Sequence, residues 1–386
     1  MYFAQGAIFS YYTALNSLYL RSFDLSMSKI GVVAGLAMIP FVLKIFLGML
    51  SDRVNLLGLG HRKPYILIGI LIQTLAVLAL PLIHPARQYG LFILAAFLLM
   101  SGMALYDTCT DGLALDTTPQ AEQGTIQGLM VGGRALGLVL VAGVLGAVAD
   151  HSWPAVFYTL AGLSLLPLPL VLLVRETPRP AGEAFAWNAF STFLRPSIIT
   201  LGLLGALYSL VTNGASQILN PFLQDQYNIS YTQAGFYTAV WGLGVVLGGF
   251  SGGRLTDRVG FQRAARWALL ISLAAILALA FIFSPQTAWP LAALSGLAYG
   301  YYETVYFALS MRLTDPRIAA SMFSILMAVA NLGTAVGVGM SGILVDTLGY
   351  RGTFAIIAGL NLLALPLLPV IFRKQIQQGA AVPAIK

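Results

Sequence analysis

Charged residues are scarce in this chain. Asp, Glu, Lys and Arg make up only 9% of its 386 residues, whereas soluble domains carry about 25%. Hydrophobic residues make up 58%, and apolar runs of the ~20 residues needed to cross a bilayer recur along the whole sequence. No soluble core accounts for such a composition. It predicts an all-α protein that crosses a membrane many times.

Signatures of several other protein classes are missing as well. A single cysteine, Cys109, excludes an intrachain disulfide, and the three histidines fall in or near loops without the spacing of metal ligands. No Walker loop is present, and the N-terminus lacks the basic region and cleavage site of a signal peptide. The net charge of +7 comes from residues in short loops and not from a basic cluster among aromatic residues. We therefore expect no enzyme, no cofactor and no nucleic-acid partner, and we interpret the first apolar run as a permanent span.

Apolar runs separated by loop signals predict twelve transmembrane helices. The predicted spans are 5–22, 30–51, 64–83, 89–115, 124–149, 154–174, 197–220, 232–254, 265–284, 288–311, 320–345 and 351–372. One longer interruption, rich in proline and charge, marks a linker at 176–196. It divides the chain into an N-terminal six-helix bundle, residues 1–175, and a C-terminal six-helix bundle, residues 197–372, with a cytoplasmic tail at 373–386.

Positive charge is distributed unevenly between the two sides of these spans. Most Lys and Arg residues fall on the side that carries both termini and the linker, and the opposite side holds only Arg21, Lys29, Arg87 and Arg351. Because cytoplasmic loops are enriched in Lys and Arg, this predicts cytoplasmic N- and C-termini. Short loops and the lack of targeting segments favour a bacterial inner membrane.

The two halves resemble copies of one another. GMLSDRV follows span 2 and GRLTDRV follows span 8, each at the predicted cytoplasmic end. A shift of 196 residues also places Asp107 on Glu303 and Asp150 on Asp346. Internal duplication of this kind is typical of transporters, whose substrate site lies between the halves near the membrane midplane.

Twelve spans in two halves, with GMLSDRV…GHRK after span 2 and GRLTDRVGFQR after span 8, resemble the major facilitator superfamily over essentially the whole chain. The segment from Ile39 to Lys44, the Asp52-Arg53 pair and the later YDTCTDGLALD are similar to one branch of that family. This branch contains muropeptide permeases, acetyl-coenzyme A transporters and folate–biopterin carriers. The resemblance implies transport by alternating access, and an organic solute that can be large or anionic.

The doubled loop motif lies where spans meet water at the predicted cytoplasmic side. In the superfamily this loop supports closure between the halves. The resemblance thus implies a cytoplasmic gate, and by position its residues are Asp52, Arg53, Arg62, Asp257, Arg258 and Arg263. The alternative is that these are ordinary loop charges of the positive-inside kind.

Four charged residues of the first half are predicted inside spans: Lys44, Asp107, Asp111 and Arg134. Charges are costly inside a membrane and usually face a cavity or a partner. Asp107 and Asp111 are one turn apart on one helix face, and Lys44 and Arg134 lie at similar depths, so we expect a network without net charge. This network is either structural, or one carboxylate exchanges protons during transport. Asp107 is then the better candidate, and Asp111, nearer the cytoplasm, is the other.

Glu303 is the remaining charged residue predicted within a span. It takes the repeat position of Asp107, but the second half offers no cation inside a span, and four tyrosines lie near it between residues 299 and 306. Such an acid should be protonated part of the time or face water. We rank it with Asp107 as a candidate proton carrier. The alternative is an acid satisfied by tyrosine hydroxyls.

Polar and aromatic residues on three spans indicate a hydrogen-bonding substrate pocket, because tyrosine offers both a ring and a hydroxyl. The candidates are Tyr11, Tyr12, Asn16, Asn213, Gln217, Tyr299, Tyr302 and Tyr306, with Gln5 as a further polar residue. For any single tyrosine, packing within the bundle is an equally good interpretation. Tyr2, Tyr19 and Tyr227, near span ends, are assigned to an interfacial belt.

The sequence therefore predicts a monomeric twelve-span carrier in the lipid bilayer that moves a small or medium organic solute, coupled to protons through Asp107, Glu303 or both. Lys44 and Arg134 would hold the acids or meet an anionic group of the solute. Sodium coupling and uncoupled transport are alternatives, as is a non-transporting membrane assembly factor on the same fold. The proline-containing glycine motif that drug antiporters of the superfamily carry on span 5 is absent, which disfavours efflux.

Overall fold

The computed structural model describes residues 1–56, 60–117, 123–173, 176, 194–313 and 319–372, and the regular structure in these ranges is helical throughout. The side chains of residues 45, 52, 53, 115–117, 123–128 and 319–321 are outside the description. The predicted tail at 373–386 and most of the predicted linker also lie outside the described ranges.

The first half contains the helices of six crossings. In chain order they are α1 (Tyr2–Ala14), α2 (Asn16–Arg21), α3 (Met27–Ala37), α4 (Ile39–Val42), α5 (Lys44–Arg53), α6 (Lys63–Ala79), η2 (Leu80–Leu82), α7 (Tyr89–Thr117), α8 (Gln123–Ala149), α9 (Trp153–Leu165) and α10 (Leu168–Leu173). Proline accounts for two of the breaks, because it cannot donate the backbone hydrogen bond that continues a helix. Pro40 lies in the first turn of α4, and Pro167 directly precedes α10.

The second half has longer, less interrupted helices. They are α11 (Pro196–Tyr227), α12 (Tyr231–Val259), α13 (Phe261–Leu279), α14 (Pro285–Leu313), α15 (Ala319–Leu360) and η5 (Asn361–Ala364), followed by helical residues 367–372. Two crossings are merged in α15, because the chain reverses at Gly349. Its φ of 72° lies in the left-handed region that glycine adopts without strain.

These helices confirm the all-α fold with twelve crossings. Among the described residues, nine stretches are long and apolar enough to cross a membrane. One of them, Met322–Phe372, holds the two crossings on either side of Gly349. The other two crossings are Tyr2–Arg21, which is interrupted at Leu15, and α14, whose tyrosines and charges make it more polar.

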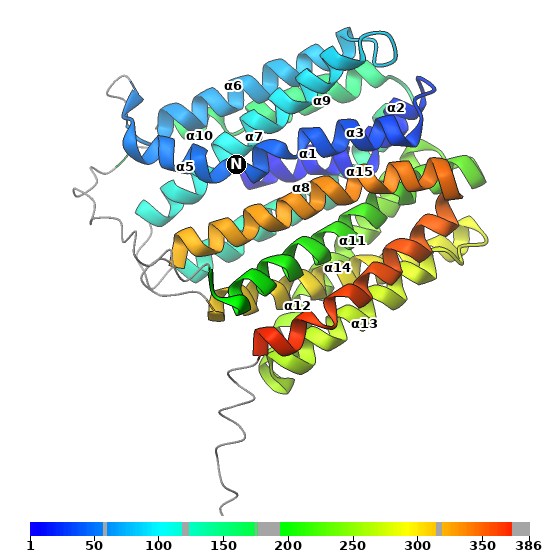
Figure 1. The fold of residues 1–386 in the computed structure, drawn as a ribbon. Helices are drawn as coiled ribbons and strands as arrows, with labels where there is room; N and C mark the ends of the chain where they lie inside the picture. Colours follow the sequence, from blue (N-terminus) through cyan, green and yellow to red (C-terminus); the bar gives the residue numbers. More distant parts are fainter. Residues whose placement is uncertain (57–59, 118–122, 174–175, 177–193, 314–318, 373–386) are drawn as a thin grey trace, which may run out of the picture.

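The two halves lie side by side, and the axes of their helices are roughly aligned, with successive crossings alternating in direction (Figure 1). In the first half α6 packs on α7 and α1 on α8, and in the second half α12 packs on α14 and α11 on α15. Across the boundary, α8 packs against α12 and α3 against α15. The division into two bundles at 1–175 and 197–372 stays a prediction.

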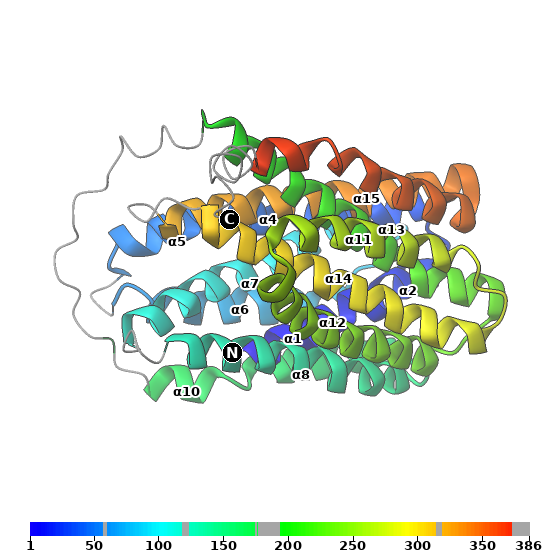
Figure 2. The same cartoon turned by 90° about the horizontal axis from the view of Figure 1, so that it is seen from below.

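Figure 2 shows α5 and α10 at one end of the molecule and α2 at the other. We call these the Arg62 end and the Asp346 end, after two residues that lie there. The Arg62 end is the one predicted to be cytoplasmic.

The Asp346 end is held together by two matching contacts between the halves. Asp346, from the second half, accepts hydrogen bonds from the backbone N–H groups of Met27 and Ser28, the first two residues of α3, at 3.0 and 2.7 Å. Asp150, from the first half, accepts from the first two N–H groups of α12 at 2.9 and 3.0 Å. Because carboxylates favour the positive N-terminus of a helix, both contacts stabilise this end in its closed form.

Glycines let the helix backbones of the two halves touch at the same end. A Cβ added to Gly342 on α15 would lie 2.1 Å from the carbonyl oxygen of Met27, and one added to Gly146 on α8 would lie 2.3 Å from that of Tyr231. Neither position has room for a side chain while the end is closed. Close backbone approach at glycine is a common way for helices to associate inside membranes.

Aromatic rings fill the core of the first half. Tyr19 is only 3% exposed and packs against Phe23, Phe92, Trp153 and Phe157. The assignment of Tyr19 to an interfacial belt is therefore wrong, because its ring lies inside the bundle. The single cysteine, on α7, is fully buried in the same core.

Candidate functional site

The ion pairs expected around Asp107 are present in the structure. Asp107 on α7 is 4% exposed, and its carboxylate oxygens lie 3.4 Å from Lys44 Nζ and 3.7 Å from Arg134 Nη2. The Gln5 amide group donates to the same carboxylate at 2.7 Å, and the Gln5 carbonyl accepts from Arg134 Nε at 2.8 Å. Two cations and an amide of its own half thus surround Asp107 and compensate its buried carboxylate.

Asp111 makes a different contact, one turn nearer the Arg62 end. Its carboxylate accepts a hydrogen bond from the Tyr2 hydroxyl, and the Arg134 guanidinium lies over the ring of Tyr2, with 5.1 Å between the guanidinium carbon and the ring centroid. Tyr2 therefore takes part in the charge network, and its assignment to an interfacial belt stays a prediction. No spacing in the sequence indicates this contact, because Tyr2 and Asp111 belong to different spans.

Glu303 on α14 is partly buried and interacts with groups from both halves. Tyr299 and Tyr208 of its own half and Arg134 of the first half are close enough for electrostatic interaction. None of the ion pairs between described residues includes Glu303, so Arg134 acts on it over a longer distance than on Asp107. The side chain of Arg134 is 42% exposed, forms an ion pair with Asp107 of its own half and acts electrostatically on Glu303 of the other half.

The predicted pocket residues separate into two groups. Five are buried in packed cores or where the halves meet: Tyr11, Asn16, Gln217, Tyr302 and Tyr306. Three are partly exposed: Tyr12, Asn213 and Tyr299. Packing is the better interpretation of the first group, and only the second group can meet a solute in this conformation.

The residues of the predicted gate lie at the Arg62 end, where Arg62 holds together helices of the first half. It is only 7% exposed, its guanidinium donates to Ser51 of α5 at 2.6 Å, and it lies so close to Gly112 of α7 that a Cβ there would come within 2.4 Å. Gly112 thus gives the buried guanidinium its space. Asp257, Arg258 and Arg263 are exposed at the ends of α12 and α13, and the side chains of Asp52 and Arg53 lie outside the described residues. The gating role stays a prediction.

Sequence reasoning missed a contact made by Glu176. Its carboxylate accepts hydrogen bonds from the backbone N–H groups of His61, Arg62 and Lys63 at the start of α6, the first two at 2.8 Å. An acid is favoured at a helix N-terminus. The first residue of the predicted linker is therefore tied to the loop between spans 2 and 3.

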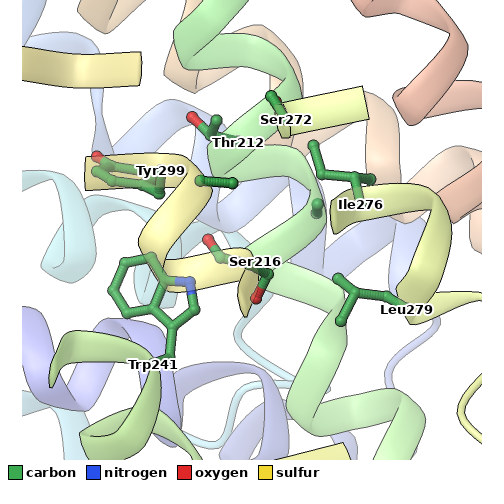
Figure 3. Close-up of a pocket in the computed structure, with 10 residues that line it drawn as sticks. Thr212, Ser216, Trp241, Ser272, Ile276, Leu279 and Tyr299 are labelled. Carbon is green, nitrogen blue, oxygen red and sulfur yellow. The ribbon is translucent and has the colours of Figure 1, made fainter. Parts of the chain in front are cut away.

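A small cavity lies inside the second half, between α11, α12, α13 and α14 (Figure 3). The space open to the centre of a water molecule is about 10 Å³. Figure 3 shows Trp241 and Tyr299 on one side of it and Ser272, Ile276 and Leu279 on the other. Because Tyr299 and Glu303 are one helical turn apart, the cavity borders the candidate site.

The family model described as Major Facilitator Superfamily matches residues 1–321 and 201–384. This chain belongs to the major facilitator superfamily. It is therefore a membrane transporter and not an enzyme, and it is a secondary transporter of organic solutes that crosses the membrane several times.

Relatives of this transporter are similar over most of its length. The folate-biopterin transporter of Synechocystis sp. is 25% identical over 380 residues, which cover 92% of this chain and 75% of the relative. AmpG 2 of Rickettsia prowazekii, whose name calls it a transporter, is 23% identical over 376 residues, or 93% of this chain and 90% of the relative. Both confirm the resemblance to the branch of muropeptide permeases and folate–biopterin carriers. The multidrug resistance protein MdtG of Salmonella typhimurium is 24% identical over 379 residues, which cover 93% of this chain and 90% of that protein.

Solved structures confirm the fold. A bacterial homologue of the human lysosomal transporter Spinster, in an inward-facing and unoccupied conformation, superimposes with a TM-score of 0.80 at 19% identity. The match covers 97% of this chain and 95% of that one.

Proposed function

We propose that this chain moves an organic solute by alternating access and couples the movement to protons through Glu303. The observation that carries the proposal is the position of Arg134, which belongs to the first half and interacts with an acid of each half. Asp107 moves together with Arg134, whereas Glu303 belongs to the other half.

The charge of Glu303 depends on the distance between the halves. A partly buried carboxylate is stable as an ion only where a cation or water supports it. When the halves rotate against each other, the distance from Glu303 to Arg134 changes, and the balance between its protonated and ionised forms changes with it. Proton uptake and conformational change are thereby linked, as coupled transport requires.

Asp107 is the weaker candidate for the proton carrier. Lys44, Arg134 and Gln5 all contact its carboxylate, and all of them belong to its own half. Their distances do not depend on how the halves are arranged. We therefore assign Asp107 to holding Lys44 and Arg134 in place, with Asp111 as a second acid of the same network.

The solute site lies between the halves, next to Arg134 and the partly exposed Tyr12, Asn213 and Tyr299. An exposed guanidinium favours a solute with an anionic group, since Arg binds carboxylate and phosphate through paired hydrogen bonds. The name of the Synechocystis relative supports folate and biopterin as the first compounds to test.

We propose that the protein is a monomer in a bacterial cell membrane, with its Arg62 end and both termini in the cytoplasm. The excess of Lys and Arg in the loops of that side supports this orientation. The closed Asp346 end then faces outward, and the solute site opens to the cytoplasm.

The decisive experiment measures internal pH in proteoliposomes while folate, biopterin and other organic anions are added to wild type, Glu303→Gln and Asp107→Asn. We expect one solute to move protons with wild type and to enter Glu303→Gln vesicles without any pH change. Asp24→Asn is the matched control, because Asp24 is exposed and has a φ of 59°, a conformation that asparagine tolerates.

Other outcomes would replace this proposal. Solute uptake that follows a sodium gradient, with no pH change in any variant, would establish sodium coupling. A pigment or protein that stays bound through purification, with no flux of any solute, would support the membrane assembly factor.

A further inference from the structure

The guanidinium of Arg134 is held in one orientation by a side chain of α1. The Gln5 carbonyl oxygen accepts a hydrogen bond from Arg134 Nε at 2.8 Å, and the Gln5 amide nitrogen donates to Asp107 at 2.7 Å. Gln5 is only 1% exposed and precedes Gly6, where an added Cβ would lie 2.1 Å from the Arg134 carbonyl oxygen. Because the backbones of α1 and α8 touch at this glycine, the position of Gln5 beside the guanidinium is fixed.

Groups of the first half cover one edge and one face of this planar guanidinium. Nε and Nη2 form the covered edge, where Nε donates to Gln5 and Nη2 lies 3.7 Å from Asp107. The ring of Tyr2 lies against one face. The second edge, between Nη1 and Nη2, makes no hydrogen bond or ion pair with any residue that the structure describes. Since the side chain is 42% exposed, this second edge is the part of Arg134 that is left for a ligand.

The two N–H groups of the free edge match the paired oxygens of a carboxylate or a phosphate. The charges around the site favour the carboxylate. Lys44 and Arg134 face the three acids Asp107, Asp111 and Glu303, so the site has one excess negative charge when Glu303 is ionised. A carboxylate that binds together with one proton on Glu303 leaves this excess unchanged, whereas a phosphate dianion would add to it.

We propose that Gln5 is a positioning residue that turns the free edge of Arg134 toward the solute, and that this edge binds one carboxylate group. Without the Gln5 amide, Nε is free, and the guanidinium can rotate on its flexible stem or turn further onto Asp107. The free edge then has no fixed place. The choice of a carboxylate rests on the proposed function, because it needs the proton on Glu303, whereas the orientation of Arg134 rests on the contacts of Gln5 alone.

The inference can be tested before the natural solute is known. The probes are benzoate, its neutral amide benzamide and the dianion phenyl phosphate, whose ring suits the partly exposed Tyr12 and Tyr299. The Kd of each probe for the full-length protein follows from the rise of the thermal unfolding midpoint with probe concentration, at constant ionic strength. We expect wild type to bind benzoate about tenfold more tightly than benzamide, as charge-assisted hydrogen bonds require, and phenyl phosphate more weakly than benzoate.

Removal of the Gln5 amide should reduce this preference without affecting the neutral probe. In Gln5→Leu and Gln5→Met, which keep the size of the side chain, the ratio of the benzamide and benzoate Kd values should fall about fivefold, the factor for loss of one hydrogen bond. The Kd of benzamide should stay as in wild type. Gln73→Leu is the matched control, because Gln73 is equally buried in the same half but donates to Ser164 at 2.7 Å.

Four results would overturn the inference. Equal binding of benzoate and benzamide by wild type would show that no edge of Arg134 takes a carboxylate. An unchanged ratio in both Gln5 variants would remove the positioning role, and an equal loss of both probes would make that role purely structural. Tighter binding of phenyl phosphate than of benzoate would overturn the carboxylate.

The proposed function fails separately, in the proteoliposome experiment. If Glu303→Gln still moves protons with solute, proton coupling through Glu303 fails and the charge argument for the carboxylate fails with it, while the orientation of Arg134 by Gln5 stands. If Glu303→Gln abolishes proton movement and the Gln5 variants keep the wild-type preference for benzoate, only the role of Gln5 fails.

Discussion

Asp150 and Asp346 hold the two halves together by the same interaction made twice in opposite directions. Each occupies the equivalent position of its repeat, and each binds the first two backbone N–H groups of a helix in the other half. The closed Asp346 end is thus a symmetric pair of helix caps. Opening it requires both caps to break.

Removal of one of these carboxylates should favour the form that is open at the Asp346 end. A capping side chain contributes about 1 kcal/mol, so Asp346→Ala should raise the open population about fivefold, and Asp150→Ala should do the same. Double electron–electron resonance between spin labels at Arg87→Cys and Gln286→Cys, both exposed near this end, measures the two populations. Loss of thermal stability with an unchanged distance distribution would show that the carboxylates stabilise their helices without holding this end closed.

The ion pair between Arg21 and Asp225 should contribute much less than the two caps to keeping the Asp346 end closed. It is short, at 2.8 Å, but its side chains are 33% and 26% exposed. Partly exposed pairs are screened by water and contribute about 0–1 kcal/mol. We expect Asp225→Asn to shift the same distance distribution by less than Asp346→Ala, and a larger shift would show that the caps are not the main contact.

Lys44 and Asp107 should be energetically coupled. Lys44→Met removes one of the two cations that compensate the buried Asp107 carboxylate, so it should lower the thermal unfolding midpoint. In an Asp107→Asn background, where no carboxylate needs compensation, the same substitution should lower the midpoint less. Lys44 is 21% exposed, so we expect a coupling of about 1 kcal/mol. Unfolding midpoints of the four proteins in one detergent complete the cycle, and additive effects would argue against the pair.

The closed end should not tolerate a methyl group at its glycine contacts. In Gly342→Ala the new Cβ would lie 2.1 Å from the Met27 carbonyl oxygen, which forces α3 and α15 apart. We expect solute exchange to fall about 5- to 150-fold (on the order of 1–3 kcal/mol of overpacking). Gly162→Ala on α9 is the control, because no described atom lies within 4 Å of a Cβ there, and it should retain wild-type exchange.

The membrane spans and the Asp107 ion pairs could be predicted from sequence because both are determined by the large free-energy cost of placing charged groups inside a membrane. A charge in a span needs a partner, and the depths of Lys44 and Arg134 were enough to indicate which partners Asp107 has. The shift of 196 residues likewise paired Asp150 with Asp346 before any contact was known.

Other contacts could not be predicted because they depend on how distant helices are rotated against each other. Tyr2 belongs to the charge network only because α1 turns its ring toward Arg134 and α7. Glu303 interacts with a cation of the other half, which no count of charges within the second half could reveal. The cavity at Ser272 needs four helices in place at once.

The complete burial of the only cysteine makes this protein a convenient subject for thiol chemistry. Cys109 is closed off within the first half, so water-soluble maleimides should leave the wild-type chain unlabelled. A cysteine introduced at an exposed position is then the one site that such a reagent labels. Movements of the two halves can be followed by labelling without first replacing a native residue next to Asp107.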